Sequence, residues 1–197
     1  MNNPEITNAA ATAILDTQRW LERAVIGLNL CPFAKAVHVK GLIRYAVSEA
    51  TTTVELLIDL KNELNSLANM DATGISIAYD TTLLIAPYCL HDFLDFNDFL
   101  GKADKIIAKM KLEGTIQLAN FHPQYQFAGT EPDDITNFTN RAPYTTLHLL
   151  KESSIDQAVA AFPEAEAIFE VNMQTMERLG RTGWDALDVG KTNPTRS

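Results

Sequence analysis

The sequence predicts an α/β (or α+β) fold, a single-domain sandwich of about four mostly parallel strands with helices packed on the sheet. Two observations lead to this prediction. Strand-like and helix-like patterns alternate between residues 42 and 121, and the chain of 197 residues is 46% hydrophobic and 21% charged, which is enough for one proper core. Consecutive strand–helix–strand units imply parallel strands joined by right-handed crossovers.

The first element is a helix over residues 10–30. Apolar side chains recur there at three- and four-residue steps and so share one face, at Ile14, Leu21, Val25 and Leu28. Pro32 ends or turns this helix, and a short basic segment with Lys35, His38 and Lys40 follows it.

Residues 42–48 alternate between apolar and polar positions and are expected to form the first strand. Thr52 and Glu55 have the spacing of a capping box, which predicts the start of a helix that continues to about Ala68. The continuous apolar run 82–86 suits a strand that is covered on both faces. Residues 75–79 are either a further strand or a lead-in to this one.

Asp92 is placed to cap a helix that runs to about Lys111. The third strand is expected at residues 115–121 and the fourth, free to return antiparallel, at residues 144–151. A helix over residues 154–161 and another from Pro163 to Gly180 complete the prediction, the second with acidic residues in its first turn.

Composition limits the classes of function. The net charge is −9, and the basic residues are scattered, so we expect no nucleic-acid partner. No run approaches the roughly 18 apolar residues of a membrane span, and the first residues have no signal-peptide pattern. Two cysteines make no disulfide framework. We therefore expect a cytoplasmic protein with reduced thiols, a globular domain over residues 1–190 and a mobile tail over residues 191–197; the oligomeric state is not readable.

The most informative stretch is the polar loop 122–143, between the third and fourth strands. A connection of this length is uncommon inside a compact domain and is usually functional or disordered. Disorder is the weaker interpretation, because the loop keeps the aromatic residues Tyr125, Phe127 and Phe138. The loop therefore marks a candidate site.

Three motifs carry a resemblance to a known family. The stretches NLCPFA (29–34), NFHPQYQFAGTEPDD (120–134) and TNRAPYTTLHLLKE (139–152) resemble the bacterial family known as domain of unknown function 1415. The resemblance implies a bacterial cytoplasmic protein and no particular activity. The family pattern covers a set of residues that does not include Cys89 or His91: Cys31, Pro32, His122, Pro123, Tyr125, Phe127, Asp133, Asn140, Arg141, Pro143 and His148.

The first functional hypothesis is an enzyme that acts on a small anionic molecule. Cys31 would be the nucleophile and His122 the general base, and the planar guanidinium of Arg141 would anchor the anion. A thiolate needs a cationic or basic neighbour to lower its pKa, and Lys35, His38 and His122 are the candidates. The remaining candidate substrate-binding residues are Asn140, Tyr125, Asp133 and Asp134.

Each candidate also has a structural interpretation. Cys31 can be a packing residue, His122 can hydrogen-bond a loop carbonyl, and Arg141 can pair inside the loop with Asp133 or Asp134. His148 is more often a satisfied residue on a sheet face than part of a site.

Two further functions stay open. In the first, the chain would be a non-catalytic module that binds a ligand or a metal with the 122–143 loop. In the second, it would be a metal-dependent enzyme with Cys31 and histidines as ligands. No local metal-ligand spacing and no nucleotide-binding glycine loop is present, so we assign no metal ligand and no cofactor.

Overall fold

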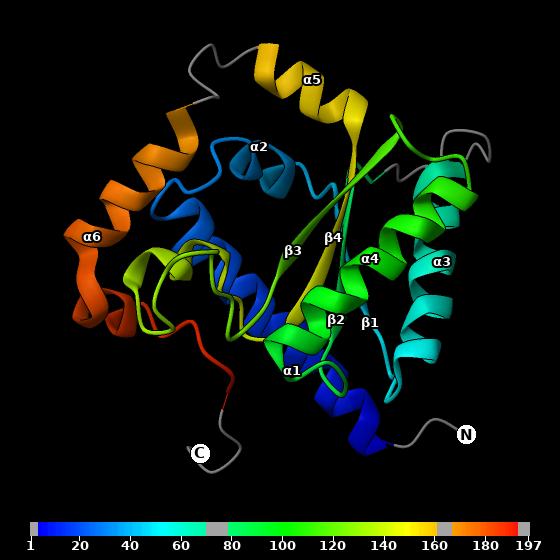
Figure 1. The fold of residues 1–197 in the computed structure, drawn as a ribbon, viewed down its shortest axis with the longest axis horizontal. Coiled ribbons are helices and arrows are strands. Elements are labelled where there is room, and N and C mark those ends of the chain that lie inside the picture. Colours follow the sequence, from blue (N-terminus) through cyan, green and yellow to red (C-terminus); the bar gives the residue numbers. More distant parts are fainter. Residues whose placement is uncertain (1–3, 70–78, 161–166, 193–197) are drawn as a thin grey trace.

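The structure is a computed structural model that describes residues 4–69, 79–160 and 167–192 (Figure 1). Its elements follow the chain in this order: α1 (Pro4–Trp20) with a π-helical continuation (Leu21–Ile26), α2 (Ala34–Val39), β1 (Ile43–Val47), α3 (Thr53–Asn69), β2 (Thr81–Ala86), α4 (Phe93–Lys109), β3 (Ile116–Phe121), a 3₁₀ helix (Ile135–Asn140), β4 (Thr145–Lys151), α5 (Glu152–Ala160) and α6 (Ile168–Ala186).

The four strands form one mixed sheet in the order β1-β2-β4-β3. β1 and β2 pair in parallel, whereas β4 pairs antiparallel with β2 on one side and with β3 on the other. β1, β2 and β3 therefore run in the same direction. The predicted α/β fold and strand directions are confirmed, but two of the three pairings are antiparallel because β4 lies between β2 and β3.

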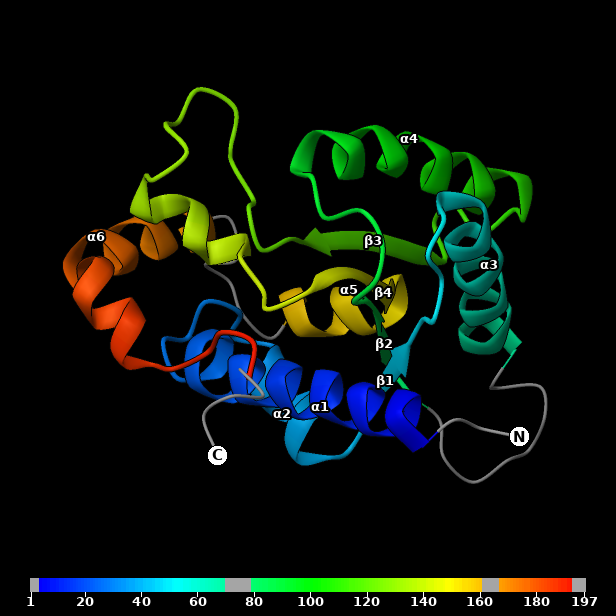
Figure 2. The same cartoon turned by 90° about the horizontal axis from the view of Figure 1, so that it is seen from below.

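Helices cover the sheet on both faces. Figure 2 shows α3 and α4 on one side of the sheet and α1 on the other. Leu84, Leu147 and Leu149 pack on the α3/α4 side with fully buried residues of those helices, Leu56, Leu60, Leu64, Phe96 and Phe99. On the opposite side Ile85 packs with Ala13 of α1. Coverage on both faces explains why the sequence of β2 is a continuous apolar run.

Local capping signals position the two helices of the α3/α4 side. The carboxylate of Glu55 accepts a hydrogen bond from the backbone N–H of Thr52 (3.0 Å), and the N–H of Glu55 donates to the Thr52 hydroxyl (3.3 Å). At α4, Asp92 accepts from the N–H groups of Leu94 (2.8 Å) and Asp95 (3.1 Å). Both predicted caps are confirmed, and each satisfies N–H groups that a helix end leaves without partners.

Two helix boundaries can be compared with the sequence. The basic segment after Pro32 forms the short helix α2. Gly180 has a non-helical backbone (φ 62°, ψ 178°) and ends the first helical segment of α6, as predicted; a second helical segment follows it to Ala186. The expected start of that helix at Pro163, and the alternative strand at residues 75–78, lie outside the described residues. None of the helices within the described ranges is both long and apolar enough to cross a membrane.

His148 is the histidine of the sheet itself. Its Nε2 lies 2.6 Å from the hydroxyl of Thr81, and that hydroxyl donates to the carbonyl of Leu149 (2.7 Å). Because a hydroxyl has a single hydrogen, Nε2 of the imidazole is the donor toward Thr81. Burial lowers the pKa of His148 to about 4, so the ring is neutral near pH 7.

Protonation of His148 should therefore link stability to pH. The unfolded chain binds a proton below about pH 6.5 that the folded chain does not bind until about pH 4. This difference removes at most about 3 kcal/mol of the free energy of unfolding as pH falls through that window. In His148→Gln, which keeps a side-chain donor, urea unfolding at about pH 7 and pH 4.5 should show a smaller loss than in the wild type.

His38→Gln is the matched control, since it removes a histidine of α2 that lies outside the sheet. An undiminished loss of stability in His148→Gln would contradict the assignment. Some dependence should remain, because burial lowers the pKa of His122 as well.

Candidate functional site

The 122–143 loop leaves the end of β3 and returns into β4, and these strands are neighbours in the sheet. The backbone N–H of His122 donates to the carbonyl of Asn140 (3.2 Å), which closes the base of the loop. The 3₁₀ helix 135–140 lies just before its return. The loop is therefore an ordered unit attached to two adjacent strands.

His122 is fully buried, with 0% of its surface exposed. The backbone N–H of Gln124 donates to its Nδ1 (3.0 Å), so Nδ1 carries no hydrogen and Nε2–H donates to the carbonyl of Leu90 (3.0 Å). The ring stacks on Phe96 at a centroid distance of 5.2 Å. Burial lowers the pKa of His122, which favours the neutral ring. Both nitrogens of this ring are engaged in hydrogen bonds to the backbone.

The carbonyl that His122 holds belongs to a strained residue. Leu90 lies in the loop between β2 and α4 with φ of +55°, a left-handed conformation that is uncommon for a residue other than glycine. Its carbonyl also accepts a hydrogen bond from the hydroxyl of Thr145 (2.9 Å), the first residue of β4. His122 and Thr145 together fix the path of the chain after β2.

Arg141 bonds within its own loop. Its Nε donates to the carbonyl of Tyr125 (3.1 Å), its Nη2 donates to the carbonyl of Pro132, and its guanidinium lies 4.2 Å from the ring centroid of Phe138. Burial lowers the pKa of Arg141, the nearby Arg181 lowers it further, and Asp133 raises it. Within the described part of the chain, Arg141 and His122 share no hydrogen bond or ion pair.

The other predicted substrate-binding residues also have partners in the loop. Asp134 caps the 3₁₀ helix by accepting from the N–H of Thr136 (2.8 Å), and Asp133 is exposed. The side chain of Asn140 hydrogen-bonds the hydroxyl of Tyr125, which lowers the pKa of that phenol against the larger, opposite effect of burial. The ring of Tyr125 contacts Phe93 and Phe127, at centroid distances of 5.1 and 5.0 Å.

Asn137 organises the loop, and the sequence analysis missed it. It is fully buried, and its Oδ1 accepts from the N–H of Phe127 (2.9 Å) and the hydroxyl of Thr130 (2.8 Å), while its Nδ2 donates to the carbonyl of Glu131 (2.8 Å). A polar side chain between Ile135 and Phe138, both of which pack inward, is the signal that could have identified it.

Cys31 is half-buried and packs at the margin of a cluster that includes Trp20 and Leu30. Burial raises the pKa of its thiol, and the backbone N–H groups of Phe33 and Ala34 offset part of this effect. The candidate base His38 is instead 3.4 Å from Glu22. Among the described residues, no group of three or more His, Cys, Asp or Glu side chains is arranged to hold a metal ion.

A cavity of about 190 Å³ lies where β2 and β3 end and β4 begins. Ligands of α/β proteins bind at this carboxyl edge of a sheet. The cavity is lined by residues of four segments, Ala86, Pro87, His91, Pro123, Gln124, Thr145 and Lys191. His91 and Lys191 are the basic residues of this lining, which contains no Asp or Glu.

Lys191 is the cavity residue that comes from the end of the chain. Its ammonium group lies 4.8 Å from the ring centroid of Tyr144, a cation–π contact. Burial lowers the pKa of Lys191, and the carboxylate of Asp16 raises it. Residues 191 and 192 thus contact the domain, although they were assigned to a mobile tail; residues 193–197 lie outside the described ranges.

A second, larger groove of about 660 Å³ lies on the other side of the β2–α4 loop and shares His91 with the cavity. Acidic side chains of α4 and its cap contribute to its walls, namely Asp92, Asp95 and Asp98. His91 and Lys102 also line the groove, whereas the lining of the smaller cavity contains no Asp or Glu, so the two hollows differ in charge.

Comparison with known proteins gives a family and no activity. No curated protein and no solved structure matched the chain. A family model described as "Protein of unknown function (DUF1415)" matches residues 12–186, which include every strand, the 122–143 loop and most of the helices. The motifs around Cys31, His122 and Arg141 had suggested the same family. This chain belongs to the DUF1415 family of proteins of unknown function.

Proposed function

We propose that this protein binds a small anionic molecule in the cavity at the carboxyl edge of its sheet. The observation that carries the proposal is that His91 and Lys191 both line a 190 Å³ cavity whose lining has no Asp or Glu. The whole chain has a net charge of −9, so a pocket lined by a lysine and by no carboxylate contrasts with the rest of the molecule. Such a pocket attracts anions and repels cations.

The cavity suits a compact group such as a phosphate or a carboxylate. Its volume is below the roughly 300 Å³ at which pockets for drug-sized ligands begin. Gln124 lines the cavity together with Lys191, whose ammonium group is a charged donor. Charge-assisted hydrogen bonds from such donors are stronger than neutral ones and fix the orientation of an oxyanion.

His122 is assigned a positioning role in this proposal. Its Nδ1 already accepts from Gln124, and its Nε2–H already donates to Leu90. Both contacts hold backbone segments that carry cavity residues, because His91 follows Leu90 and Gln124 is itself in the wall. To act as a general base, the imidazole would first have to break the bond from Gln124.

Binding without covalent chemistry is the alternative that the geometry favours. The enzyme hypothesis requires a thiolate at Cys31 and a nearby base, whereas burial raises the pKa of that thiol. It also requires Arg141 to reach a ligand, whereas two of its donor groups bond to loop carbonyls. The catalytic roles of Cys31 and His122 stay predictions, as do the substrate-binding roles of the loop residues.

We also propose that the protein is bacterial and cytoplasmic, as the family resemblance implies. Neither a nucleic acid nor a membrane is proposed as a partner, and the net charge of −9 supports this choice.

Binding of inorganic phosphate tests the proposal. Isothermal titration should detect phosphate binding to the wild type. Lys191→Met should weaken it about tenfold, since it removes a charged donor, and His91→Gln should weaken it less. The matched control is Lys102→Met, which removes an equal charge from the acid-lined groove and should leave affinity unchanged. Equal affinities of Lys191→Met and Lys102→Met would refute the cavity as the site.

Alkylation of Cys31 tests the enzyme hypothesis separately. In a Cys89→Ser background, the rate of reaction with iodoacetamide should rise with a midpoint above the value of about 8.5 for a free thiol, because burial raises the pKa. A Cys31→Ser background reports Cys89 in the same way, as a matched comparison. A midpoint well below 8.5 for Cys31 would support a thiolate nucleophile and count against a purely structural thiol.

A further inference from the structure

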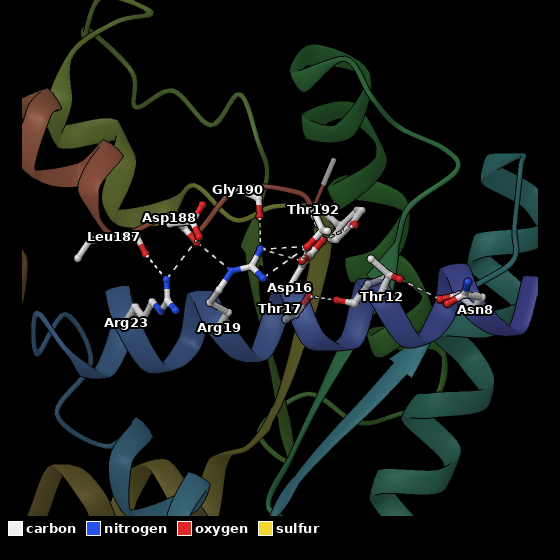
Figure 3. A network of polar contacts seen from close by, with 12 residues as sticks. Asn8, Thr12, Asp16, Thr17, Arg19, Arg23, Leu187, Asp188, Gly190 and Thr192 are labelled. Atoms are coloured by element: carbon white, nitrogen blue, oxygen red, sulfur yellow. Dashed lines mark hydrogen bonds and ion pairs between the residues drawn. The ribbon is translucent and has the colours of Figure 1, made fainter. Parts of the chain in front are cut away.

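The last described residues of the chain are bound to the first helix by a dense set of polar contacts (Figure 3). At its centre is Asp16 of α1, which is fully buried. One carboxylate oxygen accepts from the hydroxyl of Tyr144 (2.8 Å) and the backbone N–H of Thr192 (2.9 Å). The other accepts from Arg19 Nη2 (2.8 Å) and from the Thr192 hydroxyl. A buried carboxylate is thus satisfied by partners from α1, from the residue before β4 and from the chain end.

Residues 187–192 cross α1 as a strap held mainly by its backbone. Arg19 donates from Nε to the carbonyl of Asp188 and from Nη2 to the carbonyl of Gly190, both at 2.8 Å. Arg23 donates to the carbonyl of Leu187 (3.0 Å). In Figure 2 the red segment after α6 returns along α1 to make these contacts.

The strap leads directly into the cavity. Lys191 lies between Gly190 and Thr192, both of which are fixed by the contacts to Arg19 and Asp16. Its ammonium also lies over the ring of Tyr144, whose hydroxyl bonds to Asp16. Asp16 is therefore connected to the position of Lys191 twice, through the backbone of Thr192 and through the ring of Tyr144, although neither Asp16 nor Arg19 lines the cavity.

Most of these contacts are polar. The described strap has one buried apolar side chain, Val189, and Leu187 is partly buried against the same cluster, whereas Lys191 and Thr192 are exposed over much of their surface. Hydrogen bonds to an Asp or an Arg can be exchanged for water when a segment leaves, so such a segment opens more easily than one that is packed by apolar side chains. An anion that binds Lys191 would add a contact that exists only in the docked arrangement.

We propose that residues 187–192 form a movable wall of the anion site and that Asp16 and Arg19 are the positioning residues that hold it closed. This inference rests on the proposed function and adds its regulation. Docking of the strap brings Lys191 to the anion, and the bound anion in turn holds the strap. Because such coupling is reciprocal, anything that loosens the strap weakens anion binding, and anion binding protects the strap.

Hydrogen exchange read by mass spectrometry, with inorganic phosphate as the probe, tests the coupling in the full-length protein. Saturating phosphate should slow exchange at residues 187–192 at least about fivefold, with little change at β1 or α5. Arg19→Gln should speed exchange of the strap without phosphate and weaken phosphate binding about tenfold, although Arg19 does not touch the cavity. Saturating phosphate should restore part of the protection.

Two further variants keep the test decisive. Arg44→Gln is the matched control, because Arg44 pairs with Glu63 of α3 at 2.7 Å on the opposite side of the sheet; it should leave both strap exchange and phosphate affinity within about twofold of the wild type. Thr192→Val removes the hydroxyl that donates to Asp16 and accepts from Arg19, keeps the backbone contact of residue 192 to Asp16, and should weaken binding about threefold. It carries the test if Arg19→Gln does not fold.

The outcomes separate the two proposals. If the wild type does not bind phosphate, the proposed function fails, and the coupling fails with it. If phosphate binds and Lys191→Met weakens it, but strap exchange is unchanged or Arg19→Gln and Thr192→Val bind as well as the wild type, the coupling alone is overturned and the strap is a fixed part of the fold.

Discussion

The carboxyl edge of this sheet depends on one buried carbonyl, that of Leu90. It accepts hydrogen bonds from His122, which follows β3, and from Thr145, which begins β4, while Leu90 itself belongs to the loop after β2. Three strand ends are therefore joined at a single atom. The cavity is bounded by Thr145 and by neighbours of the other two residues in sequence, such as His91 and Pro123. Its shape follows from these two bonds, which also hold Leu90 in a backbone conformation that it would not adopt by itself.

Much of the fold could be predicted because its signals are local. A capping box needs only Thr52 and Glu55, and the start of α4 needs only Asp92. The order of the strands in the sheet depends on contacts between distant parts of the chain, so local signals do not predict it. The pattern of β4 fits an edge position as well as the place it takes between β2 and β3, since period and hydrophobicity describe the faces of a strand and not its neighbours. The break at Gly180 was predictable from a local signal, whereas the helical segment that follows it to Ala186 was not predicted.

The sequence predicted which loop forms the candidate site, but it did not predict the roles of the individual residues. Length marked residues 122–143 as a candidate site, and aromatic content indicated that they are ordered, as the structure describes them. The roles depend on partners that are distant in the chain. His122 bonds to a carbonyl 32 positions away, and Thr192 bonds to Asp16 across 176 positions. Nothing near Lys191 in the sequence KTNPTRS signals such a partner, so composition alone favoured a mobile tail.

The central place of β4 has a consequence for how the chain acquires its structure. β2 and β3 share no hydrogen-bonded edge, and the strand that joins them is the last of the four along the chain. Thr81 pairs with Leu150, so the sheet closes only after the segments of α4, β3 and the polar loop have been synthesised. Pairings this distant in sequence form slowly. Until β4 arrives, one edge of β2 and both edges of β3 are unpaired and able to pair with another chain. Early chain termination before residue 145 would leave these edges permanently open.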